Sequence, residues 1–119
     1  MKSNQVKALD KLFSEVIRLR ANGFCEHCGH WVEFAGINPS HFAGRSNKML
    51  RWDEYNVQGL CNDCHMRFTN HKNEYFLWIL KRIGEDGMVD QIKRANTIQK
   101  QDYEVIKEQL QNRIKELQR

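Results

Sequence analysis

The chain has 119 residues, a formal net charge of +4 and a pI near 9.0. This length predicts one domain, residues 1–119, with a modest hydrophobic core. The charge favours an anionic partner without identifying it. With one proline and seven glycines the chain does not resemble a long disordered segment. It also has no apolar run suited to a signal peptide or a membrane span, so we expect a cytoplasmic protein with no membrane partner.

The charge is distributed unevenly along the chain. Residues 1–24 carry +3, residues 25–80 carry −1 and residues 81–119 carry +2. We therefore expect three parts within the single domain: an N-terminal helix, a central core and a C-terminal helical tail. A core that mixes acidic residues with a local basic loop suits a site that must hold both a cation and a phosphate.

Apolar residues recur every three or four positions between residues 4 and 20, which predicts an amphipathic helix. Ser3 or Asn4 can cap its start, and Asn22-Gly23 can end it. The apolar stripe faces the core and consists of Val6, Leu9, Phe13, Val16 and Ile17, widened by Leu12 and Leu19.

Two Cys-x-x-Cys pairs follow, Cys25 with Cys28 and Cys61 with Cys64. In a reducing compartment, such pairs bind metal more often than they form disulfides. Two pairs can complete one tetrahedral site, so we expect a structural Zn²⁺ bound by four thiolates. His27 and His30 are alternative ligands, but with four cysteines available we expect them to be exposed polar residues. Gly29 suits the tight turn just past the second cysteine.

The segment between the pairs is predicted to contain a hairpin and a basic loop. Residues 31–35 alternate apolar and polar side chains and then reach Gly36 and Pro39, so a short hairpin is expected, with its second strand carrying residues 40–42. Residues 43–51 form an open loop. Its three basic residues are candidate contacts to DNA phosphates: Arg45, Lys48 and Arg51.

Helices are predicted from about Asn62 onward. The first carries many apolar positions up to Ile83, and the polar residues 70–73 can interrupt it. Gly84 and Gly87 punctuate the chain before a short helix over residues 88–95. Asp102 can cap a last helix. That helix has an apolar stripe that could pack on the first helix or on a second subunit, and it consists of Tyr103, Ile106, Leu110, Ile114 and Leu117.

The core also contains a His…Asn…His series formed by His41, Asn56 and His65. If a helix begins at Asn62, His65 projects from its first turn, where backbone N–H dipoles favour anions. His71 lies about 240° further around that helix and does not share its face. A zinc frame would bring the two ends of this segment together, so His41 and His65 are expected to lie near each other.

These motifs together resemble the HNH (ββα-metal) endonucleases, and more closely the NinG/Rap family of lambdoid phage recombination nucleases. The likeness covers nearly the whole chain. It is carried by residues 24–29, Ser40-His41-Phe42, residues 50–56, the second cysteine pair and Asn73-Glu74-Tyr75. The Arg-Trp-Asp-Glu segment at residues 51–54 is its most family-specific part, because many zinc modules share the cysteine pairs.

The resemblance implies an α+β fold: a small ββα-metal (HNH) core with a Cys₄ zinc site, flanked by N-terminal and C-terminal helices. It implies a phosphodiester hydrolase that cuts branched DNA, such as Holliday junctions and D-loops, in the bacterial host cytoplasm. Carried over to this sequence, His41 is the general base, Asn56 orients the loop or the base, and His65 binds a catalytic Mg²⁺ or Mn²⁺.

Two positions depart from the family patterns. Ser40 stands where many HNH enzymes have an Asp ligand, which leaves Asp53 as a candidate for the other protein ligand. His65 stands where the NinG/Rap type tends to have Asn. The alternative functions are a non-catalytic zinc-dependent DNA-binding module and a protein-interaction adaptor. For an enzyme acting on a junction with two related strands, a homodimer is also expected.

Overall fold

The computed structural model describes residues 3–119. This part of the chain is α+β, with four α-helices, one short 3₁₀ turn and a two-stranded antiparallel sheet. The elements in chain order are α1 (Asn4–Ala21), η1 (Phe34–Gly36), β1 (Asn38–His41), β2 (Val57–Leu60), α2 (Asn62–Asn70), α3 (Lys72–Ala95) and α4 (Tyr103–Leu117).

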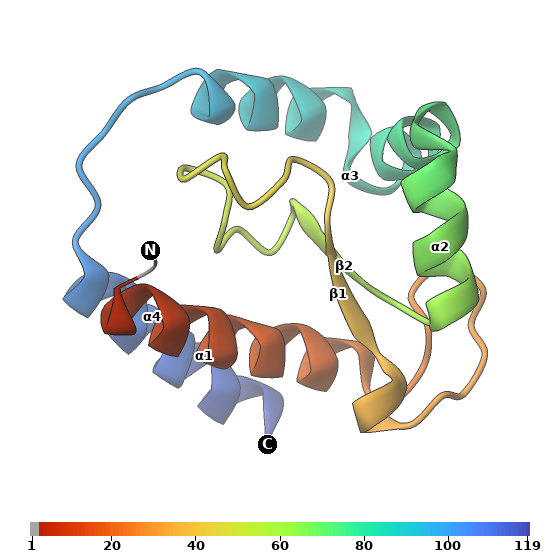
Figure 1. Ribbon diagram of the computed structural model, residues 1–119, viewed down its shortest axis with the longest axis horizontal. Helices are drawn as coiled ribbons and strands as arrows, with labels where there is room; N and C mark the ends of the chain where they lie inside the picture. Colours follow the sequence, from red (N-terminus) through yellow and green to blue (C-terminus); the bar gives the residue numbers. More distant parts are fainter. Residues whose placement is uncertain (1–2) are drawn as a thin grey trace.

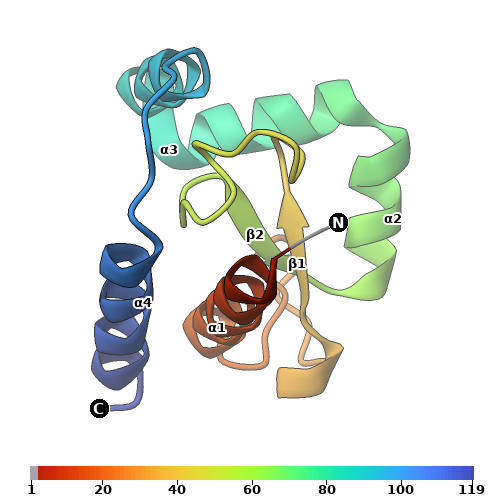
Figure 2. The ribbon, with the colours of Figure 1, turned by 60° about the vertical axis from the view of Figure 1, so that its left-hand side comes forward.

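The small sheet lies between two pairs of helices (Figures 1 and 2). On one side α1 packs along α4, and on the other side α2 leads into α3. The linker at residues 96–102 crosses from α3 back to α4 along one edge of the molecule. In this arrangement, α1, which precedes the sheet in the chain, lies beside α4, which follows it.

The first helix has the predicted ends. Ser3 is its N-cap, with its side chain accepting a hydrogen bond from the Val6 backbone N–H at 3.2 Å. Asn22 closes it in the left-handed conformation, with φ of 54°. Its buried face is made by Leu9, Phe13, Val16, Ile17 and Ala21.

The apolar stripe of α4 packs against α1. Leu110 is 6% exposed and belongs to the core cluster that contains Leu9 and Phe13. The rest of the stripe packs on the same cluster and consists of Tyr103, Ile106, Ile114 and Leu117. The N-cap is Asp102, as predicted, with its carboxylate accepting from the backbone N–H groups of Glu104 and Val105. Of the two predicted roles for this stripe, the structure shows packing on the first helix.

The predicted hairpin is wrong in its pairing. Residues 38–41 do form a strand, but their partner is β2, in a register that sets Asn38 against Leu60 and His41 against Val57. The alternating residues 31–35 do not form the other strand because the cysteine turn uses their backbone groups. Val32 donates to the Gly23 carbonyl at 2.8 Å, and Trp31 bridges Phe24. Glu33 then takes a positive φ of 65°, which ends the extended run before η1.

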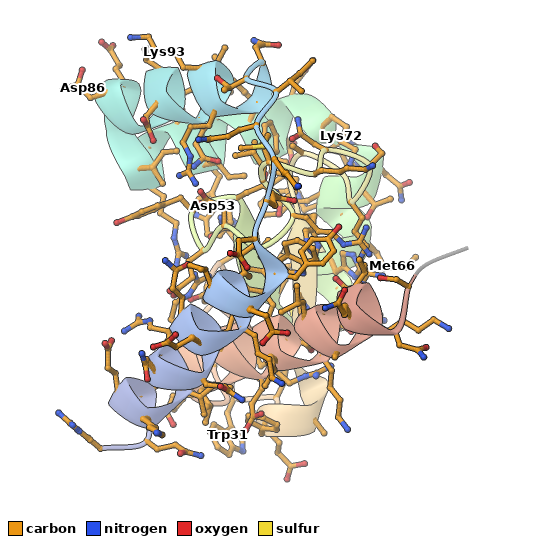
Figure 3. The ribbon with its side chains drawn as sticks, turned by 90° about the vertical axis from the view of Figure 1, so that its left-hand side faces the viewer. Trp31, Asp53, Met66, Lys72, Asp86 and Lys93 are labelled. Carbon is orange, nitrogen blue, oxygen red and sulfur yellow. The ribbon has the colours of Figure 1, made fainter. Side chains whose placement is uncertain are left out.

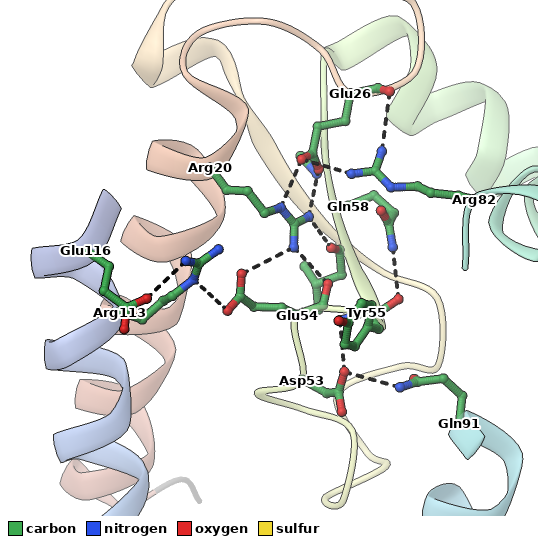
Figure 4. A network of polar contacts seen from close by, with 12 residues as sticks. Arg20, Glu26, Asp53, Glu54, Tyr55, Gln58, Arg82, Gln91, Arg113 and Glu116 are labelled. Atoms are coloured by element: carbon green, nitrogen blue, oxygen red, sulfur yellow. Dashed lines mark hydrogen bonds and ion pairs between the residues drawn. The ribbon is translucent and has the colours of Figure 1, made fainter. Parts of the chain in front are cut away.

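The outer edge of β2 is covered by side chains (Figure 4). Arg20 donates to the Val57 carbonyl at 2.7 Å, and a Glu26 carboxylate oxygen accepts from the Gly59 backbone N–H at 2.6 Å. Burial opposes ionisation of Glu26, but the hydrogen bonds from Arg20 and Gly59 and the charges of Arg20 and Arg82 together outweigh it and lower the pKa of this carboxyl. The pair therefore satisfies an edge that would otherwise be open to pairing with another strand.

The second half of the core surrounds the cysteines. Phe68 and Tyr75 stack with parallel rings, 4.6 Å between centroids, and both are buried. The predicted interruption is present, because α2 ends at Asn70 and α3 begins at Lys72. Of the two glycines expected to punctuate the chain, only Gly84 breaks the helical backbone, with φ of 79°. Among residues 3–119, no helix is long and apolar enough to cross a membrane.

Candidate metal centre and hydrolytic site

The four cysteines form one cluster, as the sequence predicts. Their sulfur atoms all lie within 4.8 Å of one another, and the Sγ atoms of Cys28 and Cys61 are 3.8 Å apart. Four Zn–S bonds of about 2.3 Å in tetrahedral geometry require sulfur separations of about 3.8 Å. The cluster fits a four-coordinate Zn²⁺, bound by Cys25, Cys28, Cys61 and Cys64.

The two halves of the cluster come from local structures that suit thiolates. Gly29 has φ of 78° and donates its N–H to the Cys25 carbonyl at 2.9 Å, closing the first turn. Cys61 is the N-cap residue of α2, and its sulfur accepts from the Cys64 N–H. The second pair therefore sits where the first-turn N–H groups of a helix stabilise negative charge.

The histidines beside the cluster contact sulfur. The Nδ1 atom of His27 lies 3.3 Å from Sγ of Cys64, and that of His30 lies 3.4 Å from Sγ of Cys28. Both side chains are exposed, as predicted, and neither belongs to the metal-binding group. They are placed to donate N–H···S hydrogen bonds, which orient thiolate ligands.

The thiols of Cys25 and Cys64 differ in acidity because their surroundings differ. Burial opposes ionisation of Cys25, but backbone N–H groups of Cys28 and Cys61 lower its pKa to about 7. Burial raises the pKa of Cys64, and the neighbouring thiols raise it further. Thiols packed this closely cannot all ionise without a cation, which is the condition that Zn²⁺ supplies.

His41 lies at the end of β1, beside the loop of residues 43–51. Its Nε2 atom is 3.0 Å from the carbonyl oxygen of Arg51, and its ring lies 6.1 Å from the ring of Phe13. A carbonyl can only accept, so Nε2 carries the hydrogen and Nδ1 carries the lone pair in the neutral ring. Burial lowers the pKa of His41, which keeps the imidazole neutral near pH 7.

Asn56 is 2% exposed and holds both ends of the loop. Its Oδ1 accepts from the Ala43 N–H at 2.8 Å, and its Nδ2 donates to the carbonyls of Ala43 and Leu50 at 3.0 Å each. Of the two roles predicted for Asn56, these bonds support orientation of the loop. The last of these hydrogen bonds is to Leu50, which directly precedes Arg51, the residue whose carbonyl binds His41.

His65 lies in the first turn of α2, as the predicted helix start requires. Its backbone N–H donates to the Cys61 carbonyl at 2.9 Å, and its side chain is half-buried. Within residues 3–119 the only group of three or more metal-binding His, Cys, Asp or Glu side chains is the cysteine cluster. Any ion bound to His65 would therefore depend on water and substrate oxygens for most of its ligands.

The whole chain, residues 1–119, matches the family model described as Bacteriophage Lambda NinG protein. The chain belongs to this family. Searches of curated proteins and of solved structures returned no match.

In this NinG-family chain, the side chains of Ser40 and Asp53 both interact with other side chains of the protein. The Tyr75 hydroxyl lies 2.9 Å from Oγ of the buried Ser40. Asp53 forms an ion pair with Arg94 and accepts from Gln91 at 3.2 Å. It lies between the C-terminal part of α3 and the α1–α4 pair (Figure 3). These contacts give Asp53 a structural role in place of the metal-ligand role considered for it.

The three basic loop residues differ in their surroundings. The side chains of Arg45 and Lys48 are exposed, as a phosphate contact requires. Arg51 is buried, and its guanidinium is bound to both carboxylate oxygens of Asp10 at 2.9 and 2.7 Å. The predicted phosphate contacts of Arg45 and Lys48 are compatible with the fold of this NinG-family chain, whereas Arg51 is engaged inside the protein.

Asp10 was not singled out by the sequence analysis. It also accepts from the indole N–H of Trp52 at 3.0 Å, so one carboxylate on α1 contacts two consecutive residues of the site. Asp10 and Trp52 are 42 positions apart. No local spacing connects them, and the only sequence signal was an acidic residue in a mostly basic helix.

Proposed function

We propose that this protein is a metal-dependent endonuclease of the HNH type that hydrolyses phosphodiester bonds in branched DNA. Membership of the NinG family is the starting point, and the arrangement around His41 adds a chemical reason. A neutral histidine with a fixed tautomer stands beside an exposed basic loop and one strand away from a zinc-suited frame. The non-catalytic alternatives do not need such a histidine.

The observation that carries the proposal is the hydrogen bond between His41 and the Arg51 carbonyl. It directs Nε2–H into the protein and leaves the lone pair on Nδ1, where it can accept a proton from an attacking water. The lowered pKa keeps that lone pair available at neutral pH. Both properties are those of a general base.

The other predicted residues have compatible roles. Asn56 keeps the loop and its exposed cations, Arg45 and Lys48, in one conformation beside His41. His65 offers an imidazole at a helix N-terminus, where an anionic phosphate is favoured. A Mg²⁺ or Mn²⁺ ion, when bound there, would stabilise the charge that develops on the phosphate and the leaving oxygen.

The order of elements also suits the proposal. A strand ending in His41 pairs with β2, and β2 leads through Cys61 directly into the helix that bears His65. That helix contacts both strands. The strand–strand–helix order is the one expected for an HNH core, with one cysteine pair at the start of the helix and the other in the turn after α1.

The test is a cleavage assay with zinc-loaded protein on four DNA substrates: a four-way junction, a flap, a linear duplex and a single strand. We expect cutting of the branched substrates in Mg²⁺ or Mn²⁺ and none in EDTA. If no substrate is cut in either metal, the enzyme assignment fails. Salt-dependent binding to the same DNA would then favour the zinc-dependent DNA-binding module.

A further inference from the structure

The carboxylate of Asp10 connects α1 to the residues that hold His41. Its Oδ1 accepts from Nε of Arg51 at 2.9 Å and from the Trp52 indole at 3.0 Å, and its Oδ2 accepts from Nη2 of Arg51 at 2.7 Å. The side chains of Arg51 and Asp10 are 10% and 20% exposed. A bidentate, charge-assisted pair of this kind restricts the orientation of the arginine more strongly than an exposed ion pair does.

Arg51 is held from several sides. Its Nη1 donates to the backbone carbonyl of Arg45, in the same loop, at 3.1 Å. Its guanidinium lies 5.7 Å from the Trp52 ring centroid. The backbone carbonyl of the same residue accepts from His41. The side chain of Arg51 thus fixes the residue, and its backbone fixes His41.

We infer that Asp10 is a positioning residue for His41: through Arg51 it holds the carbonyl that sets the tautomer and direction of the proposed general base. The inference rests on the proposed function. It assigns Asp10 no contact with substrate, and its effect passes through one intervening residue. The charged groups around His41 are Arg45, Arg51 and Asp10 itself.

A purely structural ion pair would have different consequences. Losing it would lower stability and leave the orientation of His41 unchanged in the molecules that remain folded. A positioning role instead predicts a change at His41 within the folded protein. The tautomer of the His41 ring is a direct measure of this, because it depends on the bond to the Arg51 carbonyl.

The experiment compares two pairs of variants. Asp10→Asn weakens the contacts of Asp10 with Arg51 and Trp52, and Asp10→Ala removes them. Glu54→Gln and Glu54→Ala are the matched controls, because Glu54 also ties the segment of residues 51–56 to a helix, through Arg113 at 3.0 Å. Glu54 does not contact the residue whose carbonyl binds His41. Each variant is measured for zinc content, DNA affinity, cleavage rate at saturating enzyme, and the His41 tautomer by ¹⁵N NMR, assigned with a His41→Gln sample.

We expect Asp10→Ala to reduce the cleavage rate by about tenfold to a hundredfold, with DNA affinity and zinc content unchanged. The NMR spectrum should change from the Nε2–H tautomer to a mixture. Asp10→Asn should fall between this variant and the wild type, because its amide oxygen can still accept from Nε of Arg51 and from Trp52. Should Asp10→Ala not fold, Asp10→Asn decides the question. Both Glu54 variants should resemble the wild type.

A wild-type tautomer and cleavage rate in both Asp10 variants would overturn the inference, and so would equal losses in the Asp10 and Glu54 series. The tautomer measurement separates this result from failure of the proposed function. If the wild-type protein cuts no DNA, the NMR comparison alone still shows whether Asp10 positions His41.

Discussion

The hydroxyl of Tyr75, on α3, lies 2.9 Å from Oγ and 3.0 Å from the backbone oxygen of Ser40, on β1. Both residues are buried, and Ser40 directly precedes His41. Burial raises the pKa of Tyr75 to about 12, so this hydroxyl stays protonated as a donor. The contact ties the proposed catalytic strand to the helix on its far side.

Tyr75→Phe should therefore destabilise the protein by about 1–3 kcal/mol, because it leaves the buried oxygens of Ser40 without this donor while keeping the ring stack on Phe68. Urea unfolding measures the loss. The matched control is Tyr55→Phe, whose ring is 64% exposed and which should have little effect. Equal stabilities for Tyr75→Phe and wild type would show that the contact contributes nothing.

Zinc should be present at one ion per chain. Cys61→Ser should lose the ion and most of the cooperative fold, because structural zinc can contribute on the order of 10 kcal/mol to folding. Elemental analysis and thermal unfolding measure both effects. His30→Ala is the control, since it removes a sulfur contact and no ligand. Natively purified protein that is folded and free of zinc would contradict the prediction.

Asn56→Ala should destabilise the protein by about 2–4 kcal/mol, since it leaves three loop backbone groups without their buried partner. The loop of residues 43–51 should also become sensitive to proteolysis. Asn47→Ala provides a comparison within the same loop, because Asn47 accepts one bond of 3.3 Å from the Leu50 N–H. A loop as resistant as that of the wild type would contradict the bracing role of Asn56.

Stability should depend on pH through His41. Its folded-state pKa lies below the ordinary value of about 6.5, so below that pH the unfolded chain binds more protons than the folded one. Stability is therefore complete at neutral pH and falls as the pH drops from about 6.5 through the folded-state pKa. His41→Gln should reduce this slope, measured by urea unfolding between pH 7.5 and 5. Identical slopes would show that His41 is not held neutral by the fold.

The features that the sequence predicted well depend on neighbouring residues. Helix ends follow from single caps such as Ser3 and Asp102, and the metal cluster follows from the spacing within each cysteine pair. The strand pairing was different. Alternation at residues 31–35 indicated a strand, but the backbone groups of Trp31 and Val32 were already used by the cysteine turn. The alternation of apolar and polar residues gives no sign that these backbone groups have other hydrogen-bond partners.

The site residues divide in the same way. His41 and Asn56 could be chosen from the motif. Arg51 was a candidate phosphate contact and Asp53 a candidate metal ligand, because the partners that the structure gives them lie far away in the sequence. Asp10 precedes Arg51 by 41 positions, and Gln91 follows Asp53 by 38. Only the packing of α1 and α3 on either side of the sheet brings these groups together.

The variant that separates a nuclease from a binding module is His41→Ala. It should abolish strand cleavage while zinc content, folding and junction affinity stay nearly unchanged, because His41 would act on a water proton in the transition state. His65→Ala should also stop cleavage, by weakening the catalytic ion, so higher Mn²⁺ should restore part of the rate. The measurements are a cleavage series and a gel-shift series on one branched substrate.

Substitution of the loop cations should change DNA binding in the same two assays, whereas substitution of His41 should change cleavage. Arg45→Ala and Lys48→Ala should weaken binding and flatten its salt dependence, since each removes one exposed charge near the DNA. Arg51→Ala should act instead like the loss of Asp10, because its guanidinium is bound inside the protein. If His41→Ala cuts as well as the wild type, the general-base assignment is wrong, whatever the loop variants do. If Arg45→Ala and Lys48→Ala bind with an unchanged salt dependence, the DNA does not contact these two side chains.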